Sequence, residues 1–311
     1  MSLETRELGR TGEHVTVLGY GAMELRGEPR GPAIDNEDAG EILNAVLDSG
    51  INFVDTSIDY GNSEELIGRY ISHRRGEYFL ASKCGCMIGD PPPGMQGPPF
   101  PHDFSGENVR SGIEQSLRRL NTDHLDLLQV HISPSRDTLE SEGTIETMQA
   151  LRDEGKVRFL GMSGTIPNLA DHIEMGVFDV FQIPWSALQR EHEELIAKAS
   201  AKGAGIVIRG GVARGAPAAE KNWVAPIGMG EGEAQRRWEG ADLTDLLEGM
   251  SEMAFLLRYT LSLPDLDTTI VGTSKIAHFR SNLDAALEGP LPSDVYDEAR
   301  ARFAAAGSAP A

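Results

Sequence analysis

Residues 52–71 read NFVDTSIDYGNSEELIGRYI, which is a short apolar run, a polar loop and an amphipathic segment in that order. The apolar run ends in Asp55, and we expect it to form a β-strand. The pattern predicts an α-helix over Glu64–Ile71, with Ser63 as its N-cap. A strand–loop–helix unit of this kind packs its strand into a parallel sheet that is covered on both faces.

The same order of strand and helix recurs along the chain. Short runs rich in β-branched residues predict buried strands over Val15–Gly21, Asn52–Ser57, Tyr78–Lys83, Leu125–His131, Phe159–Gly164, Val180–Trp185, Gly205–Gly210 and Thr268–Thr273. Helices are predicted over Glu64–Ile71, Glu107–Leu120, Ile145–Arg152, Glu191–Ala201 and Ala277–Leu287. The third is expected to end near Gly155 and the fourth at Gly203. The alternation favours one α/β domain over residues 1–311, a (β/α)8 TIM barrel; a doubly wound sheet is the alternative.

The charge and composition of the chain limit the classes of partner that it can bind. The chain has 311 residues, and 28 basic against 48 acidic side chains give a net charge of −20. Such a surface repels phosphate backbones, so we expect no nucleic-acid partner, although a local cationic cluster still admits small anions. The sequence contains neither a run of about 18 apolar residues nor an apolar signal core, so we expect no membrane partner and a cytoplasmic location.

Several familiar motifs are absent. Glu24 stands where a dinucleotide fingerprint beginning at Gly19 needs its third glycine, and there is no P-loop. Cys84 and Cys86 are the only cysteines, and two thiols without a second pair do not predict a metal site. Two segments interrupt the alternation: the proline-rich 85–105 and the glycine-rich 210–243, which we expect to be loops at the mouth of the barrel.

Polar side chains end consecutive apolar runs. Asp55, Lys83 and His131 each close one run, and Tyr60 lies five residues after Asp55. Because the carboxyl ends of barrel strands converge on one mouth, these four side chains can meet there. An ammonium beside a phenol lowers the phenol's usual pKa of about 10 and makes it a usable proton donor to a carbonyl oxygen. None of the four stores electrons, so a hydride donor must bind beside them.

These residues stand in a longer pattern that resembles the aldo-keto reductases. It comprises residues 15–27 (VTVLGYGAMELRG), 52–71, 81–85 (ASKCG), 116–131 (SLRRLNTDHLDLLQVH), 151–164 (LRDEGKVRFLGMSG) and 268–286 (TTIVGTSKIAHFRSNLDAA). The resemblance implies a TIM barrel preceded by a β-hairpin at about Thr5–Val17. It also implies that NADPH binds without a Rossmann unit, that Tyr60 is the general acid/base, and that Asp55, Lys83 and His131 complete the catalytic tetrad.

The resemblance assigns cofactor contacts as well. Toward the nicotinamide they are Gly21, Ala22, Met23, Asp55, Ser163, Gly164 and Gln182, with Gly164 standing where the family usually has Asn. Toward the pyrophosphate they are Arg209, Gly210, Gly211, Val212, Arg214 and Gly215. At the end of the seventh strand, where this sequence has Arg209, the family commonly has an aromatic residue that stacks under the nicotinamide. The Arg209 guanidinium would either stack there in its place or contact phosphate.

At the adenosine end the resemblance assigns Gly272, Thr273, Ser274, Lys275, His278 and Asn282. NADPH is the expected cofactor, because Lys275 and Arg280 can supply positive charge near the 2′-phosphate. NADH is the alternative, because His278 stands where the family usually has an arginine for that phosphate. The expected function is reduction of an aldehyde or ketone, or the reverse alcohol oxidation, on a small-molecule substrate. A cofactor-binding regulatory or scaffold protein with little turnover is the alternative. Substrate identity and oligomeric state do not follow from the sequence.

Overall fold

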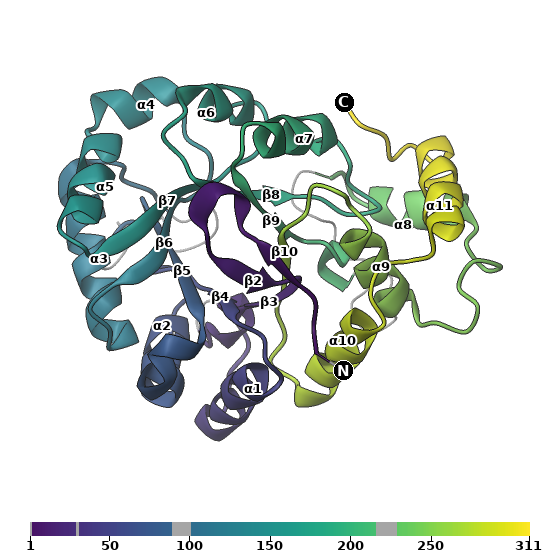
Figure 1. Ribbon diagram of the computed structural model, residues 1–311, viewed down its shortest axis with the longest axis horizontal. Coiled ribbons are helices and arrows are strands. Elements are labelled where there is room, and N and C mark those ends of the chain that lie inside the picture. The colour runs from purple at the N-terminus through teal and green to yellow at the C-terminus, as the bar shows by residue number, and fades with distance from the viewer. Residues whose placement is uncertain (1, 29–30, 89–100, 216–228) are drawn as a thin grey trace. The chain divides into compact units, whose positions relative to one another are not determined.

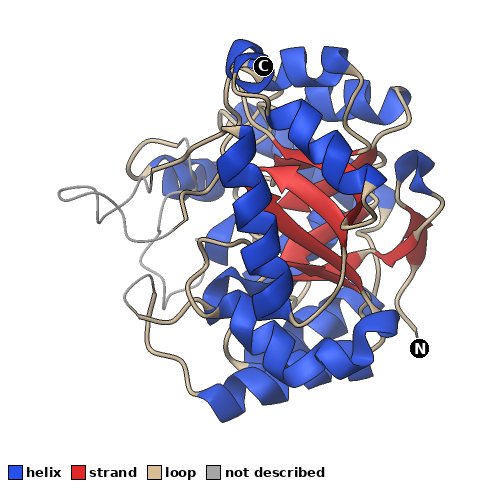
Figure 2. Ribbon diagram, turned by 90° about the vertical axis from the view of Figure 1, so that its left-hand side faces the viewer, coloured by secondary structure: helices blue, strands red, loops and turns tan. Residues whose placement is uncertain are grey.

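The computed structural model describes residues 2–28, 31–88, 101–215 and 229–311. Eight parallel strands close into a barrel in the order β10-β3-β4-β5-β6-β7-β8-β9, with helices around them (Figures 1 and 2). The barrel predicted from the alternation of strands and helices is confirmed, in place of the doubly wound alternative.

Each barrel strand overlaps a predicted apolar run, but the structure divides the run Val15–Gly21 between two strands, of which only the second is in the barrel. They are β3 (Leu18–Gly21), β4 (Phe53–Asp55), β5 (Phe79–Cys84), β6 (Leu125–Val130), β7 (Val157–Ser163), β8 (Val180–Pro184), β9 (Gly205–Arg209) and β10 (Thr268–Val271). Every residue of β4, β5, β6 and β8 is buried, as expected for a sheet covered on both faces. The expected N-terminal hairpin is also present, as the antiparallel strands β1 (Thr5–Glu7) and β2 (His14–Thr16).

The described α-helices are α1 (Asn36–Asp48), α2 (Ser63–Ile71), α3 (Gly106–Leu120), α4 (Arg136–Ser141), α5 (Thr144–Asp153), α6 (Leu169–Met175), α7 (Glu193–Ala201), α8 (Glu233–Ala241), α9 (Glu252–Leu261), α10 (Ile276–Leu287) and α11 (Ser293–Ala305). Short 3-10 helices are η1 (Gly9–Thr11), η2 (Ala22–Leu25), η3 (Ser72–Glu77) and η4 (Ala213–Gly215). The five predicted helices correspond to α2, α3, α5, α7 and α10. None of the described helices has the length and apolar character needed to cross a membrane.

Two local expectations differ from the structure. Ser63 is the first residue of α2 and its side chain does not cap the helix. Its hydroxyl instead donates to the carbonyl of Ala22 and lies 2.8 Å from the Thr56 hydroxyl, which are partners that only the fold supplies. The segment 210–243 is not all loop, because it contains α8. Parts of the two long segments, residues 89–100 and 216–228, lie outside the described residues.

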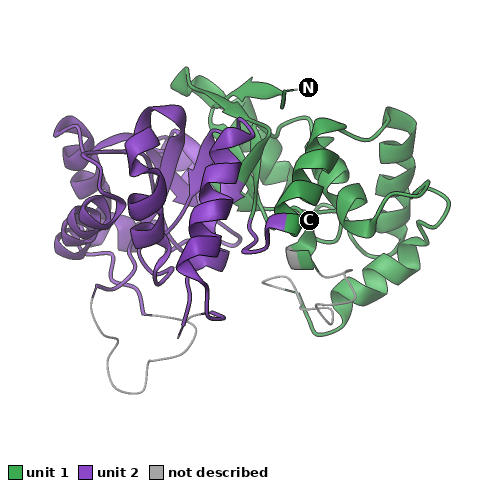
Figure 3. Ribbon diagram, turned by 90° about the horizontal axis from the view of Figure 1, so that it is seen from below, with its two compact units in different colours: residues 1–19, 182–271, 277–311 green, residues 20–181, 272–276 purple. Residues whose placement is uncertain are grey.

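The chain divides into two compact units (Figure 3). Residues 20–181 and 272–276 form one unit, which holds β4 to β7 and α1 to α6. Residues 1–19, 182–271 and 277–311 form the other, which holds the hairpin, β9, β10, α7 to α9 and α11. We call them the tetrad unit and the hairpin unit. The single domain over residues 1–311 stays a prediction.

A half-buried carboxylate links separate segments of the hairpin unit. Asp267, just before β10, accepts hydrogen bonds from the backbone N–H groups of Gly9 (3.1 Å) and Ile206 (2.8 Å). Burial raises the pKa of the Asp267 carboxyl to about 6, and the two N–H groups offset only part of this rise. A carboxyl whose pKa is higher in the folded state favours folding most at low pH, and this contribution is lost as the pH rises through the folded pKa.

We therefore expect Asp267→Asn to flatten the pH dependence of the unfolding free energy between about pH 4 and pH 7. The wild type should lose stability relative to the variant as the pH rises, because only the wild type must ionise this half-buried carboxyl. Urea unfolding at several pH values measures this slope, with the exposed Asp297→Asn as a control that keeps the wild-type slope. Parallel curves for wild type and Asp267→Asn would contradict the prediction.

Candidate active site

The ends of β4, β5 and β6 carry polar side chains in the tetrad unit. Asp55 is the last residue of β4, Lys83 is the residue before the last in β5, and His131 directly follows β6. The strand register places Lys83 opposite Gln129 of β6. Because neighbouring parallel strands run in the same direction, these side chains leave the sheet at the same end of the barrel.

Lys83 and Asp55 form a buried ion pair, with Lys83 Nζ 2.6 Å from Asp55 Oδ1 and side-chain exposures of 1% and 2%. Lys83 Nζ also donates to the carbonyl of Thr56 (2.7 Å), and Gln129 Nε2 donates to Asp55 Oδ2 (2.9 Å). A buried pair is stable only when further hydrogen bonds satisfy both partners, and both carboxylate oxygens here are occupied. Burial lowers the pKa of Lys83, but the Asp55 carboxylate and the Tyr60 phenol outweigh this, so the pKa is raised and the ammonium stays charged.

Tyr60 lies beside this ammonium. It belongs to the loop between β4 and α2, where its backbone N–H donates to the carbonyl of Ser57 (3.0 Å). Lys83 Nζ lies 4.8 Å from the centroid of the half-buried Tyr60 ring. The His131 ring stands edge-on to the same ring, with 6.2 Å between centroids and an interplanar angle of 81°. The structure thus brings all four predicted catalytic side chains together within one unit.

The start of α2 anchors the Tyr60 loop. The buried carboxylate of Glu64 accepts a hydrogen bond from Ser82 Oγ (2.9 Å), next to Lys83 in β5. Burial raises the pKa of Glu64, while hydrogen bonds from Ser116 and Ser82 and the guanidinium of Arg119 lower it in part. Sequence reasoning missed this positioning role, although Glu64 belongs to the pattern that follows Tyr60.

The tetrad unit also holds part of the predicted cofactor set. Gly21 ends β3, Ala22 and Met23 lie in η2, and Tyr20 Oη donates to the carbonyl of Thr273 (2.7 Å). A Cβ on Gly272 would collide with the carbonyl oxygen of Gly21, so a glycine is needed where these segments meet. The structure therefore places the predicted residues Gly21, Ala22, Met23, Gly272, Thr273, Ser274 and Lys275 in two adjoining segments.

Ser163 is the last residue of β7, and Gly164 follows it. Both are buried. A Cβ on Gly164 would lie 2.7 Å from Leu169 Cδ1, so a larger residue would require Leu169 to move. This packing explains why glycine suits the position where an asparagine is usual.

The remaining predicted cofactor residues belong to the hairpin unit. Gln182 is buried in β8, Arg209 ends β9, and Gly210, Gly211 and Val212 lead into η4. The carbonyl of Gly211 accepts a hydrogen bond from Thr260 Oγ1 (2.8 Å), which fixes this turn. Gly215 ends η4, and the side chain of Arg214 lies outside the part that the structure describes. His278 and Asn282 lie one turn apart on α10, and His278 is exposed.

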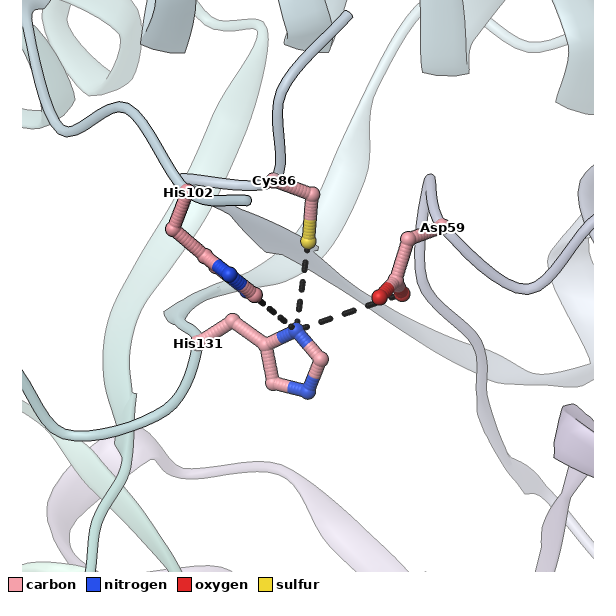
Figure 4. Close-up of side chains that lie close together, drawn as sticks. All are labelled: Asp59, Cys86, His102 and His131. Carbon is pink, nitrogen blue, oxygen red and sulfur yellow. Dashed lines mark hydrogen bonds and ion pairs between the residues drawn. The ribbon is translucent and has the colours of Figure 1, made fainter. Parts of the chain in front are cut away.

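Sequence reasoning missed three neighbours of His131. Its Nδ1 lies 3.2 Å from Cys86 Sγ, 3.4 Å from His102 Nε2 and 3.9 Å from Asp59 Oδ1 (Figure 4). Asp59 is adjacent to Tyr60 in the chain, but Cys86 and His102 come from the segment between β5 and α3. Their sequence spacing carries no signal, because an isolated bridge between Cys86 and His102 brings them together.

Comparisons with known proteins agree with this geometry. The model of the family described as aldo/keto reductase matches residues 17–302. An uncharacterized oxidoreductase, YqkF, of Bacillus subtilis is 29% identical, over 91% of this chain and 91% of its own. L-galactose dehydrogenase of Arabidopsis thaliana is also 29% identical, over 92% of this chain and 89% of its own.

A solved structure supports the same assignment. The holo form of the aldo-keto reductase AKR11C1 from Bacillus halodurans superposes with a TM-score of 0.81 at 28% identity, covering 96% of each chain. The family match spans both compact units and includes every strand of the barrel. The chain therefore belongs to the aldo/keto reductase family, whose members are NAD(P)H-dependent oxidoreductases.

Proposed function

We propose that this protein reduces an aldehyde or ketone to an alcohol with NADPH, and that Tyr60 donates the proton to the carbonyl oxygen. The observation that carries the proposal is the position of the Lys83 ammonium. Its Nζ lies 2.6 Å from Asp55 Oδ1 and 4.8 Å from the centroid of the Tyr60 ring. A fixed positive charge beside a phenol stabilises the phenolate that remains after the proton has left. The reverse reaction, alcohol oxidation, would use Tyr60 as the base.

The chain's residues suit an extended dinucleotide. Gly272 lets its segment pass close to Gly21, and Ser274 and Lys275 are exposed just before the first residue of α10. A helix N-terminus and an ammonium together favour a phosphate group. When bound, the nicotinamide supplies the hydride that the four catalytic side chains cannot supply.

The protein's part in the reaction is to place charge and a proton. Asp55 holds Lys83 charged, and Lys83 stabilises the phenolate. His131 stands edge-on to Tyr60, where its imidazole would hydrogen-bond the substrate oxygen and orient it. Such general acid catalysis contributes roughly 10²–10⁴-fold to the rate.

We expect Tyr60→Phe to lower kcat by roughly 10²–10⁴-fold and to leave cofactor affinity nearly unchanged. The ring keeps its packing, and the lost proton matters more in the transition state than in the bound ground state. Steady-state reduction of a reactive aldehyde gives kcat, and fluorescence titration with NADPH gives the affinity. If the variant keeps more than about a tenth of the wild-type kcat with chemistry rate-limiting, Tyr60 is not the proton donor.

Lys83→Met is expected to lower both kcat and stability. It leaves the Asp55 carboxylate buried without its ammonium, which should cost about 3–5 kcal/mol of unfolding free energy. The double variant Lys83→Met/Asp55→Asn is the control, and it should recover much of that stability without recovering kcat. If Lys83→Met lowers the unfolding free energy by less than about 1 kcal/mol in urea unfolding, the ammonium is not needed to stabilise the buried Asp55 carboxylate.

We expect His278→Arg to tighten NADPH binding by about tenfold and to leave NADH binding unchanged. A guanidinium binds phosphate through two parallel hydrogen bonds, whereas neutral imidazole donates one. His278→Lys is the matched control, because it adds the charge without the second hydrogen bond and should give a smaller gain. Fluorescence titration with both cofactors measures the effect. Equal affinities in wild type and His278→Arg would show that this position does not contact the 2′-phosphate.

A further inference from the structure

Four side chains of the types that can bind a metal ion converge beside Tyr60. One ligand atom from each of Asp59, Cys86, His102 and His131 lies within 4.8 Å of the other three (Figure 4). Cys86 is buried, and the other three are half-buried. All four belong to the tetrad unit. A thiol, two imidazoles and a carboxylate form a mixed set, and of the four residues only His131 has a role in the proposed reduction.

The distances in this cluster suit a tetrahedral ion. Zinc bonds of about 2.0–2.3 Å give ligand–ligand edges of about 3.3–3.6 Å in a tetrahedron. From His131 Nδ1, the observed distances are 3.2 Å to Cys86 Sγ, 3.4 Å to His102 Nε2 and 3.9 Å to Asp59 Oδ1. The widest separation, within 4.8 Å, needs a contraction of about 1 Å to reach a tetrahedral edge. Side-chain rotations of the half-buried ligands supply a change of that size.

Hydrogen bonds hold the backbone of this cluster in place. An antiparallel bridge pairs Cys86 with His102, and the His131 N–H donates to the carbonyl of Cys84 (3.0 Å). Asn108 Nδ2 donates to the carbonyls of Cys86 (3.1 Å) and Asp103 (2.7 Å), which ties together both ends of the segment between them.

A second contact orients the carboxylate. Ser57 Oγ donates to Asp59 Oδ1 (2.7 Å) and lies 3.6 Å from Cys86 Sγ. Partners of this kind around the ligands are typical of metal sites, because they fix the ligand orientations before the ion arrives.

We propose that Asp59, Cys86, His102 and His131 bind one Zn²⁺ ion in a closed tetrahedral site. Zinc favours thiolate, imidazole and carboxylate ligands in combination, and four protein ligands leave no open position for substrate. On binding, the ion replaces the proton of the Cys86 thiol, which passes to solvent. The ion bonds His131 through Nδ1, so the ring keeps its remaining proton on Nε2, the nitrogen on the other side of the ring (Figure 4).

The proposed metal site shares His131 with the proposed active site, but its occupancy does not require NADPH or a carbonyl substrate. It would nevertheless set the tautomer of His131 and restrain Asp59, the residue next to Tyr60. The one pair of thiols in the sequence, Cys84 and Cys86, does not by itself predict a metal site. The fold combines Cys86 with histidines and an aspartate that lie 16 to 45 residues away from it along the chain.

Cobalt(II) titration of the chelator-treated, reduced full-length protein tests the proposal without an activity assay. We expect one equivalent of Co²⁺ to give the visible bands of a tetrahedral ion and a near-ultraviolet band of thiolate-to-cobalt charge transfer. One equivalent of Zn²⁺ should abolish both. Cys86→Ser should remove the charge-transfer band and weaken Zn²⁺ binding by at least about 100-fold in calorimetry.

Cys84→Ser is the matched control, because Cys84 is also buried and lies two residues away, outside the cluster. It should keep the wild-type spectrum and affinity. His102→Gln, at a half-buried position, tests the site again should Cys86→Ser fail to fold, and it should also weaken Zn²⁺ binding. A wild-type spectrum without a thiolate band, or equal Zn²⁺ affinity in wild type and His102→Gln, would overturn the proposal.

Discussion

The buried ion pair between Lys83 and Asp55 is the interaction on which the proposed chemistry depends. Two charges that are almost fully removed from water would destabilise the protein if they were not matched. Here Nζ and Oδ1 lie 2.6 Å apart, and Thr56 and Gln129 satisfy further hydrogen bonds. Asp55 lies in β4, Thr56 directly follows that strand, and Gln129 lies in β6. These contacts with Lys83 of β5 and with Asp55 therefore form only when β4, β5 and β6 keep their register. The barrel therefore specifies the charge that lies beside Tyr60.

The loop that carries Tyr60 is held at both ends by buried polar contacts. Asp55 holds its beginning through the ion pair, and the start of α2 holds its end. Ser63 binds the carbonyl of Ala22, and Glu64 binds the hydroxyl of Ser82 beside Lys83. A phenol held between two such anchors needs little rearrangement to act as an acid, which is how preorganised sites lower a reaction barrier.

Much of this arrangement could be predicted from the sequence. Continuous apolar runs identified the barrel strands, because both faces of a parallel sheet exclude water. The apolar stripe of α3 identified that helix. The rule that strand ends converge at one mouth of a barrel predicts that Asp55, Lys83 and His131 lie close together.

What could not be predicted depends on partners distant in the chain. Ser63 has the residue type of an N-cap, yet its hydroxyl binds Ala22, 41 residues away. The sequence patterns did not predict α1, α4, α6, α8, α9 or α11, although α1, α4 and α9 begin after capping side chains of Asp35, Ser135 and Ser251. The cluster of Asp59, Cys86, His102 and His131 exists because of an isolated bridge between two segments, and no periodicity signals such a bridge.

The most direct test of the central claim is to follow the hydrogen that reaches carbon. NADPH carrying deuterium at the transferable C4 position of the nicotinamide is mixed with excess enzyme and a reactive aldehyde in ordinary water, and the alcohol is analysed by mass spectrometry and NMR. If the bound nicotinamide supplies the hydride and the protein supplies only the proton, the alcohol carries one deuterium on the carbon that bore the oxygen. An alcohol whose carbon-bound hydrogen comes from water, or no alcohol formed while the labelled cofactor stays bound, would contradict the account.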